Sequence, residues 1–315
     1  MKFITIIISL FLALILTLSA RSQDFEFKIL ALKGNIEVKV PKAEWKKIKT
    51  GDNINIDDII KVPKNSYIGL MHKSGRTIEI REEGDFKTKE LAEKLSSHKT
   101  TFSKRFAKYV ADEIAGGESV MKGSNYRESM QKPGSVERGI VDEFDPNKIR
   151  ITLNAPRKFT ALQPVVILQW NKVTGVTKYS FRLSDRFDRP VFSKEVGDTM
   201  IALDLAPLDI EKDVYYFWKV TSIAGVGAES ETACFLFPSF EKMAAKRDSI
   251  EMLRSELEDE TSPLNQLIMA TYLEENQLIL ESMDAYKKAI KLAPGVEEFK
   301  QVYDKFLKRY GITGR

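Results

Sequence analysis

The spacing of apolar residues changes at Pro238, and this change constrains the fold more than any other feature of the sequence. Before Pro238 most apolar residues alternate with polar ones in short runs separated by glycine- and serine-containing turns. This period-two pattern predicts antiparallel β-strands. After Pro238 apolar residues recur at helical spacing. We therefore expect a multidomain protein, mainly β plus α, whose α-helical part lies at its C-terminal end.

Residues 1–22 have the composition of a signal peptide. Lys2 supplies a positive start, an apolar run extends to Leu18, and small residues precede a cleavage point after Ser22. Cleavage after Ala20 fits less well, and the apolar run is shorter than the roughly 18 residues expected of an uncleaved anchor. No cysteine follows the run, so no lipid anchor is expected. The sequence predicts a periplasmic or secreted protein.

Cys234 is the only cysteine, so an intramolecular disulfide is impossible and stability must come from apolar cores. Removing Lys2 and Arg21 with the signal peptide leaves 47 basic against 45 acidic side chains. This near balance of charges provides no strong positive field that would attract nucleic acid. No second apolar run reaches membrane-spanning length, so we expect no transmembrane helix in the mature chain.

Residues 23–94 are predicted to form a small β domain. "FKILALKGNIEVKV", "NINIDDIIKV" and "SYIGLMHKSGRTIEIR" alternate apolar and polar residues, with turns between them. Every second residue of such a strand faces the same side. The residues expected to face the core are Ile29, Ala31, Ile36, Val38, Ile54, Ile60, Ile68, Leu70, Ile78 and Ile80.

The order of "GNIEV", Trp45, "GDNINIDDIIKV" and "NSYIGLMHKSGRTIEI" resembles the FecR-like domain. The resemblance covers about a fifth of the chain and implies an extracytoplasmic β module. Its best-known member passes signals between an outer-membrane receptor and an anti-sigma pathway. This sequence shows no cytoplasmic region before a membrane helix, so sigma-factor regulation is not the expected function; fold alone does not define function.

The next two segments differ sharply in composition. Residues 95–115 place Phe102, Phe106 and Val110 at helical spacing, with Lys104, Arg105 and Lys108 among them. A basic amphipathic helix can lie on a membrane, but we favour a helix docked on the β domain because acids interrupt the basic face. Residues 116–146 are rich in glycine, serine and charge, which predicts a flexible linker; no phosphate-loop ending follows its glycines.

Residues 147–238 form a second β unit. Trp170 closes the apolar run "VVIL", Tyr179 lies nine residues later, and Tyr216 and Val220 lie in "DVYYFWKV". These residues resemble a fibronectin type III or immunoglobulin-like sandwich, which implies that all four belong to the core. Trp170 could instead stack on a sugar, but its position beside "VVIL" favours packing. Neighbours in a strand face opposite sides, so we expect Phe217 or Trp218 to be exposed or at a domain boundary.

Residues 239–315 are predicted to be helical. Ser262 and Pro263 provide a cap and a first-turn proline. The spacing of Ala270, Ser282, Tyr286, Ala289 and Pro294 resembles a tetratricopeptide repeat, although Gln266 stands where tryptophan is usual. A peptide-gripping array needs about three repeats, and only one and a half are present. We expect a helical cap packed on itself, on the 240–258 helix or on a partner, covered by the last helix through Phe299, Val302, Tyr303, Phe306 and Leu307.

The sequence contains few motifs that indicate catalysis or metal binding. His72 and His98 have no second His or Cys at ligand spacing, and no nucleophile or zinc motif occurs. The acids Asp52, Asp57 and Asp58, and Asp185, Asp188 and Asp198, could hold calcium, but turn acids usually cap backbone amides. Glu256 to Glu260 is predicted to be a solvated helix end. We predict no catalytic, cofactor-binding or metal-binding residues and no cofactor.

Taken in order, these parts resemble exported multidomain proteins of Gram-negative bacteria of a Bacteroidetes type, a resemblance that implies no particular activity. The leading hypothesis is a non-enzymatic periplasmic or envelope-associated scaffold that binds protein or cell-wall polymer. It predicts that deleting 263–310 weakens binding without unfolding the β domains. The alternative is a FecR-like envelope sensor that contacts a membrane regulator. A third possibility, a polysaccharide-active enzyme, requires a cleft with two close acids of raised pKa. The partner and the oligomeric state are not encoded in any motif.

Overall fold

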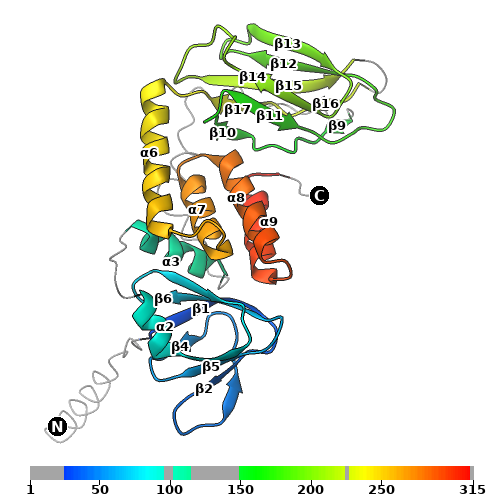
Figure 1. The fold of residues 1–315 in the computed structure, drawn as a ribbon. Helices are drawn as coiled ribbons and strands as arrows, with labels where there is room; N and C mark the ends of the chain where they lie inside the picture. Colours follow the sequence, from blue (N-terminus) through cyan, green and yellow to red (C-terminus); the bar gives the residue numbers. More distant parts are fainter. Residues whose placement is uncertain (1–24, 96–101, 115–148, 224–226, 313–315) are drawn as a thin grey trace, which may run out of the picture.

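The computed structural model describes residues 25–95, 102–114, 149–223 and 227–312. They form three units, and Figure 1 shows that the helical unit, although last in the chain, lies between an N-terminal β domain and a β-sandwich. The predicted signal peptide (1–22), the predicted linker (116–146) and His98 lie outside the described residues. Among the described helices, none is both long enough and apolar enough to cross a bilayer.

The N-terminal domain consists of two four-stranded sheets, ordered β4-β1-β6-β7 and β3-β2-β5-β8. A short helix that the sequence analysis did not predict, α2, follows the last strand and contributes Leu91, Ala92 and Leu95 to the core between the sheets. The elements are β1 (Phe27–Lys33), β2 (Glu37–Lys39), β3 (Trp45–Lys47), β4 (Asn53–Ile54), β5 (Ile59–Val62), β6 (Tyr67–His72), β7 (Thr77–Ile80), β8 (Gly84–Lys87) and α2 (Thr88–Leu95).

The predicted core of this domain is correct except at Ala31. Eight of the ten predicted residues are buried in the core between the sheets, and Ile78 packs partly buried against it. Ala31 is buried in a different core, on the side of the helical unit. The pairing of β1 with β6 shifts register between Ile29 and Ala31, and such a bulge reverses the faces of the residues that follow it.

Both faces of β6 are buried, which explains how this domain joins the rest of the molecule. One face packs in the domain's own core, whereas Tyr67 and Met71 belong to the core shared with the helices. The rings of Tyr67 and Phe299 meet edge to face with centroids 5.9 Å apart. Gly69 permits close approach, since a Cβ there would lie 2.8 Å from Cδ1 of Leu264. Burial of the second face removes a large apolar area from water.

The sandwich comprises a large sheet ordered β10-β17-β15-β12-β13, to which β16 and β9 are attached, and a two-stranded sheet of β11 and β14. Strands β10 and β17 pair in parallel, and β12 and β15 pair antiparallel at its centre. The strands are β9 (Arg150–Ile151), β10 (Lys158–Thr160), β11 (Val165–Gln169), β12 (Tyr179–Ser184), β13 (Pro190–Val196), β14 (Met200–Asp204), β15 (Tyr215–Ser222), β16 (Glu229–Ser230) and β17 (Ala233–Leu236).

The four residues predicted for the sandwich core are all buried. Trp170 and Tyr179 meet edge to face at 5.7 Å, and the backbone N–H of Val173 donates to the Tyr179 hydroxyl. The Tyr216 hydroxyl accepts from the backbone N–H of Glu211 at 2.7 Å, an arrangement typical of the tyrosine corner of immunoglobulin-like sandwiches.

Of the two alternatives expected for Phe217 or Trp218, exposure or a place at a domain boundary, exposure is wrong because both are buried. Trp218 faces the sandwich interior and stacks on Phe181, with ring centroids 5.9 Å apart. Phe217 lies on the other face of β15, opposite Cys234 on the neighbouring strand. In a central strand, flanking side chains cover even an outward-facing ring, so alternation of faces did not produce exposure here.

The helical unit contains α3 (Phe102–Ile114), α6 (Phe240–Leu257), α7 (Pro263–Glu275), α8 (Ile279–Leu292) and α9 (Glu297–Arg309). Helices α7 and α8 form the predicted hairpin: Ala270 and Ala289 are fully buried, and the Ser282 hydroxyl donates to the Ala270 carbonyl at 2.8 Å. Ser262 caps α7 by accepting from the Asn265 N–H, with Pro263 in the first turn as predicted. Helix α9 covers the hairpin, as predicted, by burying Phe299, Val302, Phe306 and Leu307 and partly burying Tyr303.

Helix α3 docks mainly on the C-terminal helices, so the predicted docking on the β domain is only partly correct. It packs chiefly on α7 and also touches α6, α9 and β1. Phe106 is buried and meets Tyr272 of α7 edge to face at 5.3 Å. The apolar face of α3 is therefore covered within the molecule, and Arg105 of α3 pairs with Glu275 of α7.

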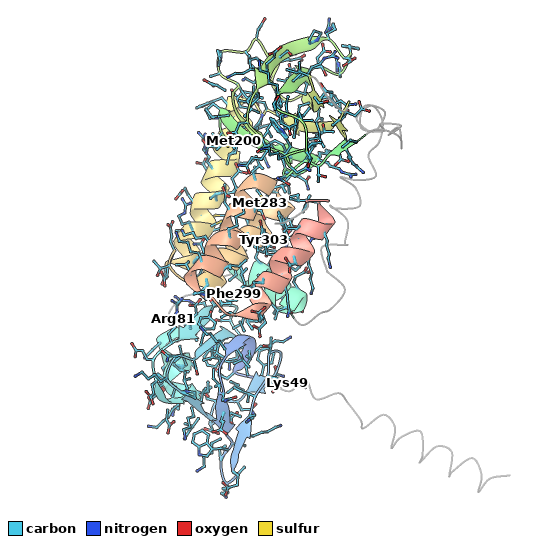
Figure 2. All side chains as sticks on the ribbon, turned by 90° about the vertical axis from the view of Figure 1, so that its right-hand side faces the viewer. Lys49, Arg81, Met200, Met283, Phe299 and Tyr303 are labelled. Carbon is cyan, nitrogen blue, oxygen red and sulfur yellow. The ribbon has the colours of Figure 1, made fainter. Side chains whose placement is uncertain are left out.

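Polar contacts fix the N-terminal domain on the helical unit. Glu79 of β7 accepts from the Leu264 N–H at 2.9 Å, so it caps the N-terminus of α7, where negative charge is favourable. Glu298 of α9 accepts from the Leu32 N–H and from the Thr50 hydroxyl. Figure 2 shows Phe299 at the end of α9 that meets this domain. Side chains from separate parts of the chain thus complete each other's hydrogen bonding.

Candidate functional site

The helical unit contains a groove between α6 and α8, with α7 as its floor. It has a volume of about 390 Å3. Apolar side chains line its base and charged ones its rims, a combination typical of sites that bind a peptide or another ligand. The apolar residues are Leu162, Ile250, Met269, Leu273 and Ala285, and the charged residues are Arg247, Glu251, Arg254, Glu281, Asp284 and Lys288.

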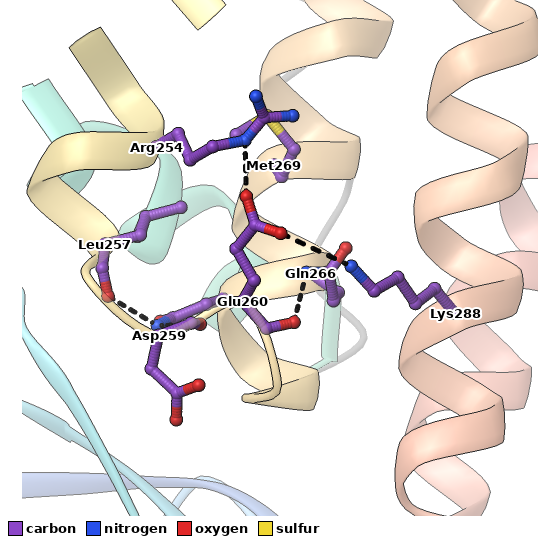
Figure 3. A pocket seen from close by; sticks show the side chains of 8 residues that line it. Arg254, Leu257, Asp259, Glu260, Gln266, Met269 and Lys288 are labelled. Carbon is purple, nitrogen blue, oxygen red and sulfur yellow. Dashed lines mark hydrogen bonds and ion pairs between the residues drawn. The ribbon is translucent and has the colours of Figure 1, made fainter. Parts of the chain in front are cut away.

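At the turn between α6 and α7 the groove narrows to a small polar pocket, shown in Figure 3. Glu260 lies between two cations: Nε of Arg254 is 2.6 Å from Oε1, and Nζ of Lys288 is 4.0 Å from Oε2. The Gln266 amide donates to the Glu260 carbonyl at 2.7 Å. Glu258, Asp259 and Glu260 are exposed, as expected of a solvated helix end, and Asp259 and Glu260 also line this pocket.

At its other end the groove opens into a cleft between α8 and the sandwich. The cleft has a volume of about 500 Å3 and shares Leu162, Gln163, Glu281 and Asp284 with the groove. On the sandwich side it is lined by Val165, Val166, Ile167 and Gln169 of β11, and on the other side by residues of α8. Together the groove and the cleft form one continuous depression. We call the part between α6 and α8 the α6–α8 groove, and the part between α8 and the sandwich the β11 cleft.

Glu281 is a partly buried acid in this depression. Burial raises its pKa, and the nearby charge of Asp284 raises it further, while Lys246 opposes the shift. Its Oε2 is buried without a hydrogen-bond partner among the described residues. Glu281 lies in the first turn of α8, where the helix dipole favours a carboxylate. A buried carboxylate oxygen without a donor favours a ligand that supplies one.

A second perturbed cluster lies inside the helical unit, away from the depression. Arg309 of α9 binds Glu274 of α7 at 2.8 Å and Glu113 of α3 at 2.6 Å, and the Tyr286 hydroxyl donates to Glu274. Burial raises the pKa of Glu274, although the charge of Arg309 partly offsets this effect. None of these residues lines the groove or the cleft. The cluster joins α3, α7, α8 and α9 and fixes α3 in place.

His72 lies in a buried hydrogen-bonded group at the end of β6. Its Nε2 is 2.8 Å from Glu26 and its Nδ1 is 2.7 Å from the Ser74 hydroxyl. Burial raises the pKa of Glu26, but hydrogen bonds from Lys73 and His72 outweigh it and hold that pKa below its usual value. The order hydroxyl, imidazole and carboxylate is that of a nucleophilic triad. None of the three residues lines the depression described above, and their contacts tie the start of β1 to the end of β6.

Four of the six acids considered for calcium act as turn caps, as the sequence analysis favoured. Asp52 accepts from the Lys49 N–H and Asp58 from the Asn55 N–H. Asp185 accepts from the Phe187 and Arg189 N–H groups, and Asp198 from that of Thr199. Within the described ranges no group of three or more His, Cys, Asp or Glu could hold a metal ion. Burial raises the pKa of Cys234 to about 12, so its thiol is unreactive near neutral pH.

Sequence reasoning identified most of the helices that build the depression but not the depression itself. Met269, Lys288 and Glu281 carry no motif, and they converge only because α6 stands apart from the α7–α8 hairpin. One signal for the cleft is present in the sequence: Pro156 lies before β10 and Pro164 directly before β11, and proline has no N–H to offer to a neighbouring strand.

No protein-family model and no curated protein sequence matches the chain. Among solved structures, the fibronectin-like protein of Clostridium thermocellum is 14% identical and aligns with 29% of this chain and 90% of its own, with a TM-score of 0.21. The fibronectin domain of human collagen alpha-1(XX) is 24% identical over 31% of this chain and 94% of its own, with a TM-score of 0.21.

A longer match is the three-domain fibronectin segment of chicken CNTN1, which is 10% identical, covers 69% of this chain and 55% of its own, and has a TM-score of 0.23. These structures are similar to this chain in their fibronectin type III domains. The chain itself is a protein of β sheets and α-helices with a fibronectin- or immunoglobulin-like β domain. Its own strand order and the Tyr216 corner define that domain.

Proposed function

We propose that the protein is a non-enzymatic, envelope-associated scaffold that binds a protein or cell-wall partner in the α6–α8 groove. In this proposal the N-terminal domain is FecR-like, the α7–α8 hairpin is tetratricopeptide-like, and the chain is exported by its signal peptide. The observation that carries the proposal is the continuous depression of apolar floor and charged rims between α6 and α8. Such surfaces bind partners by burying apolar anchors inside a polar rim.

The arrangement of the units supports a binding role. The helices contact both β units, so the walls of the depression are held by packing on the N-terminal domain and on the sandwich. A pre-organised surface loses little conformational entropy when it binds. Burial raises the pKa of Glu281, which lines the depression, whereas glycoside hydrolysis uses a matched pair of carboxyl groups. We therefore rank binding above catalysis.

Lys288→Glu tests the proposal, with Lys300→Glu as its matched control. Each lysine side chain is 48% exposed and lies near a glutamate, but Lys288 lines the groove and Lys300 lies on α9. Purified mature protein would be used to capture partners from detergent-solubilised envelope. We expect Lys288→Glu to reduce recovery of a defined partner by about tenfold, the cost of reversing one rim charge beside Glu260. Lys300→Glu should leave it unchanged.

Equal recovery with both variants would contradict the proposed site. A transcriptional response to deletion of the gene, together with binding to a membrane regulator through the N-terminal domain, would instead favour the sensor alternative.

A further inference from the structure

Strand β11 uses only one of its two edges for pairing within the two-stranded sheet. The Leu205 N–H donates to the Pro164 carbonyl and the Trp170 N–H to that of Thr199. With the antiparallel register of β11 and β14, these bonds assign the even-numbered residues to the edge facing β14. The N–H and C=O groups of Val165, Ile167 and Gln169 therefore point to the opposite edge.

That opposite edge is paired only at its end. The Asn171 N–H donates to the Thr152 carbonyl, and the Asn154 N–H donates to that of Gln169. Continuing this register would place Pro156 opposite Ile167, where it has no N–H to offer. The chain instead leaves for the other sheet, where β10 pairs with β17. The backbone groups of Val165 and Ile167 thus have no strand partner in the described part of the chain.

This free edge carries none of the usual protection. Natural proteins cover exposed edges or place charges and prolines on them. Here the side chains beside the edge are apolar and exposed: Val165 is 47%, Ile167 56% and the neighbouring Met200 43% exposed. Leu280 and Met283 of α8 line the same cleft from the other side. Figure 2 shows Met200 on the sandwich and Met283 on α8 near the junction of the two units.

The charges in the cleft indicate what kind of strand would fit. Two acids, Glu281 and Asp284, line it against one base, Lys287. The Glu281 Oε2 is buried without a partner among the described residues. A cationic side chain in the cleft would supply the missing donor and separate the two like charges.

We propose that the β11 cleft binds an extended peptide strand that carries a lysine or arginine. The peptide would add to the free edge at Val165 and Ile167, continuing the line that Thr152 to Asn154 begin. Main-chain hydrogen bonds would supply affinity, and alternate side chains would supply specificity. Residues in cross-strand pairs share a face, so the peptide's apolar residues would lie beside Val165, Ile167 and Met200. This inference deepens the proposed binding function by naming the chemistry of the partner.

The test uses a capped eight-residue peptide of alternating valine and threonine with one central threonine replaced by lysine. Binding to the purified mature protein is measured by calorimetry or fluorescence anisotropy. The valine amides are the ones expected to face β11. Methylating their nitrogens should weaken binding by at least about tenfold, whereas methylating the threonine amides should leave it within about twofold. Replacing the lysine by glutamate should also weaken binding by about tenfold.

Protein variants separate the backbone of Ile167 from its side chain. Ile167→Pro removes an N–H that does not bond to β14, so the sandwich should still fold while peptide binding falls by about tenfold. Ile167→Thr keeps the N–H and should weaken binding less. Glu281→Gln should remove most of the preference for lysine over glutamate. A thermal melt of each variant verifies folding. The methylated peptides test the hydrogen bonds to the β11 edge on the unaltered protein.

The inference is overturned if no peptide of the set binds at about 1 mM, or if methylation of the two sets of amides weakens binding equally. Failure here is distinguishable from failure of the proposed function. If the peptides bind in this pattern but Lys288→Glu does not change envelope capture, the strand site is supported and the α6–α8 groove is rejected as the partner site. If Lys288→Glu weakens capture but the peptides do not bind in this pattern, the groove is supported and the strand site is rejected.

Discussion

At the residue scale, the group around Arg309 explains why a charge can be buried among these helices. Glu274 is 2% exposed and accepts three hydrogen bonds, two from the Arg309 guanidinium and one from the Tyr286 hydroxyl. Removing one member of such a group leaves a buried, uncompensated charge, which costs far more than the pair contributes. The energetics of the helical unit should therefore depend strongly on a few polar side chains.

Arg309→Met should destabilise the protein by about 3–5 kcal/mol at neutral pH, because Glu274 and Glu113 lose their shared cation. The loss should shrink on acidification. Burial raises the folded-state pKa of Glu274 above its usual 4.5, so the folded state binds a proton at a pH where the unfolded state has lost it. Lowering the pH from about 7 to about 5 therefore favours the folded state at this site. Chemical denaturation at both pH values measures the difference.

The double variant Arg309→Met with Glu274→Gln is the control for that measurement, since it removes the acid along with the cation. It should recover part of the lost stability and lose the pH dependence. A loss that is the same at both pH values would contradict the assignment to Glu274.

Individual residues were predictable from sequence where local spacing determines packing. Trp170, Tyr216 and Tyr286 lie at positions where the strand or helix period already points them inward. Arg309 and Glu113 were not predictable as partners, because they are 196 residues apart in the chain and nothing in their local sequence records the contact.

At the element scale, the least expected feature is the docking of α3 at the β6–β7 hairpin. Gly75 in that hairpin has a φ of 95°, and a Cβ placed on it would lie 2.6 Å from the Cα of Lys104. Glycine therefore serves two purposes here: it adopts the left-handed backbone and it leaves space for the helix. Gly51 has a similar φ of 91° but has no atom within 4 Å of the equivalent Cβ.

Comparing Gly75→Ala with Gly51→Ala tests this docking. Both variants incur the backbone cost of alanine at positive φ, about 1–2 kcal/mol. Only Gly75→Ala also pushes against α3, so it should cost about 1–3 kcal/mol more. Urea denaturation gives both values. Equal losses would show that α3 does not rest on the hairpin.

The period of each segment predicted most elements correctly, but it could not predict two-sided burial. The run "YIGLMH" is buried at every position, and the continuous apolar character of "YIGLM" was a signal for a strand covered on both faces. The sequence analysis predicts an alternating strand for this run because apolar and polar residues alternate in the segments around it. The free edge of β11 escaped prediction for a related reason, since a strand's partners are set by where distant segments pass.

At the scale of the whole molecule, the order of the units in space differs from their order in the chain. Helices from the C-terminal end lie between the two β units, and their core is continuous with residues of both. This shared core counts against the expectation that residues 263–310 can be deleted without unfolding the β domains, which stays a prediction. Deletion would expose Tyr67 and Met71 of the N-terminal domain, which pack in that shared core. A linear reading of the sequence assumes that a module contacts only its chain neighbours, whereas here the C-terminal helices also contact the N-terminal domain.

The measurement that tests the central claim most directly is lysine crosslinking in the native envelope followed by mass spectrometry. If the α6–α8 groove and the β11 cleft bind the partner, crosslinks to a single partner should be concentrated at Lys287 and Lys288, which line them. Lys300, equally exposed on α9, should give few. Crosslinks concentrated at Lys300 and on the N-terminal domain, with none at Lys287 or Lys288, would contradict the claim.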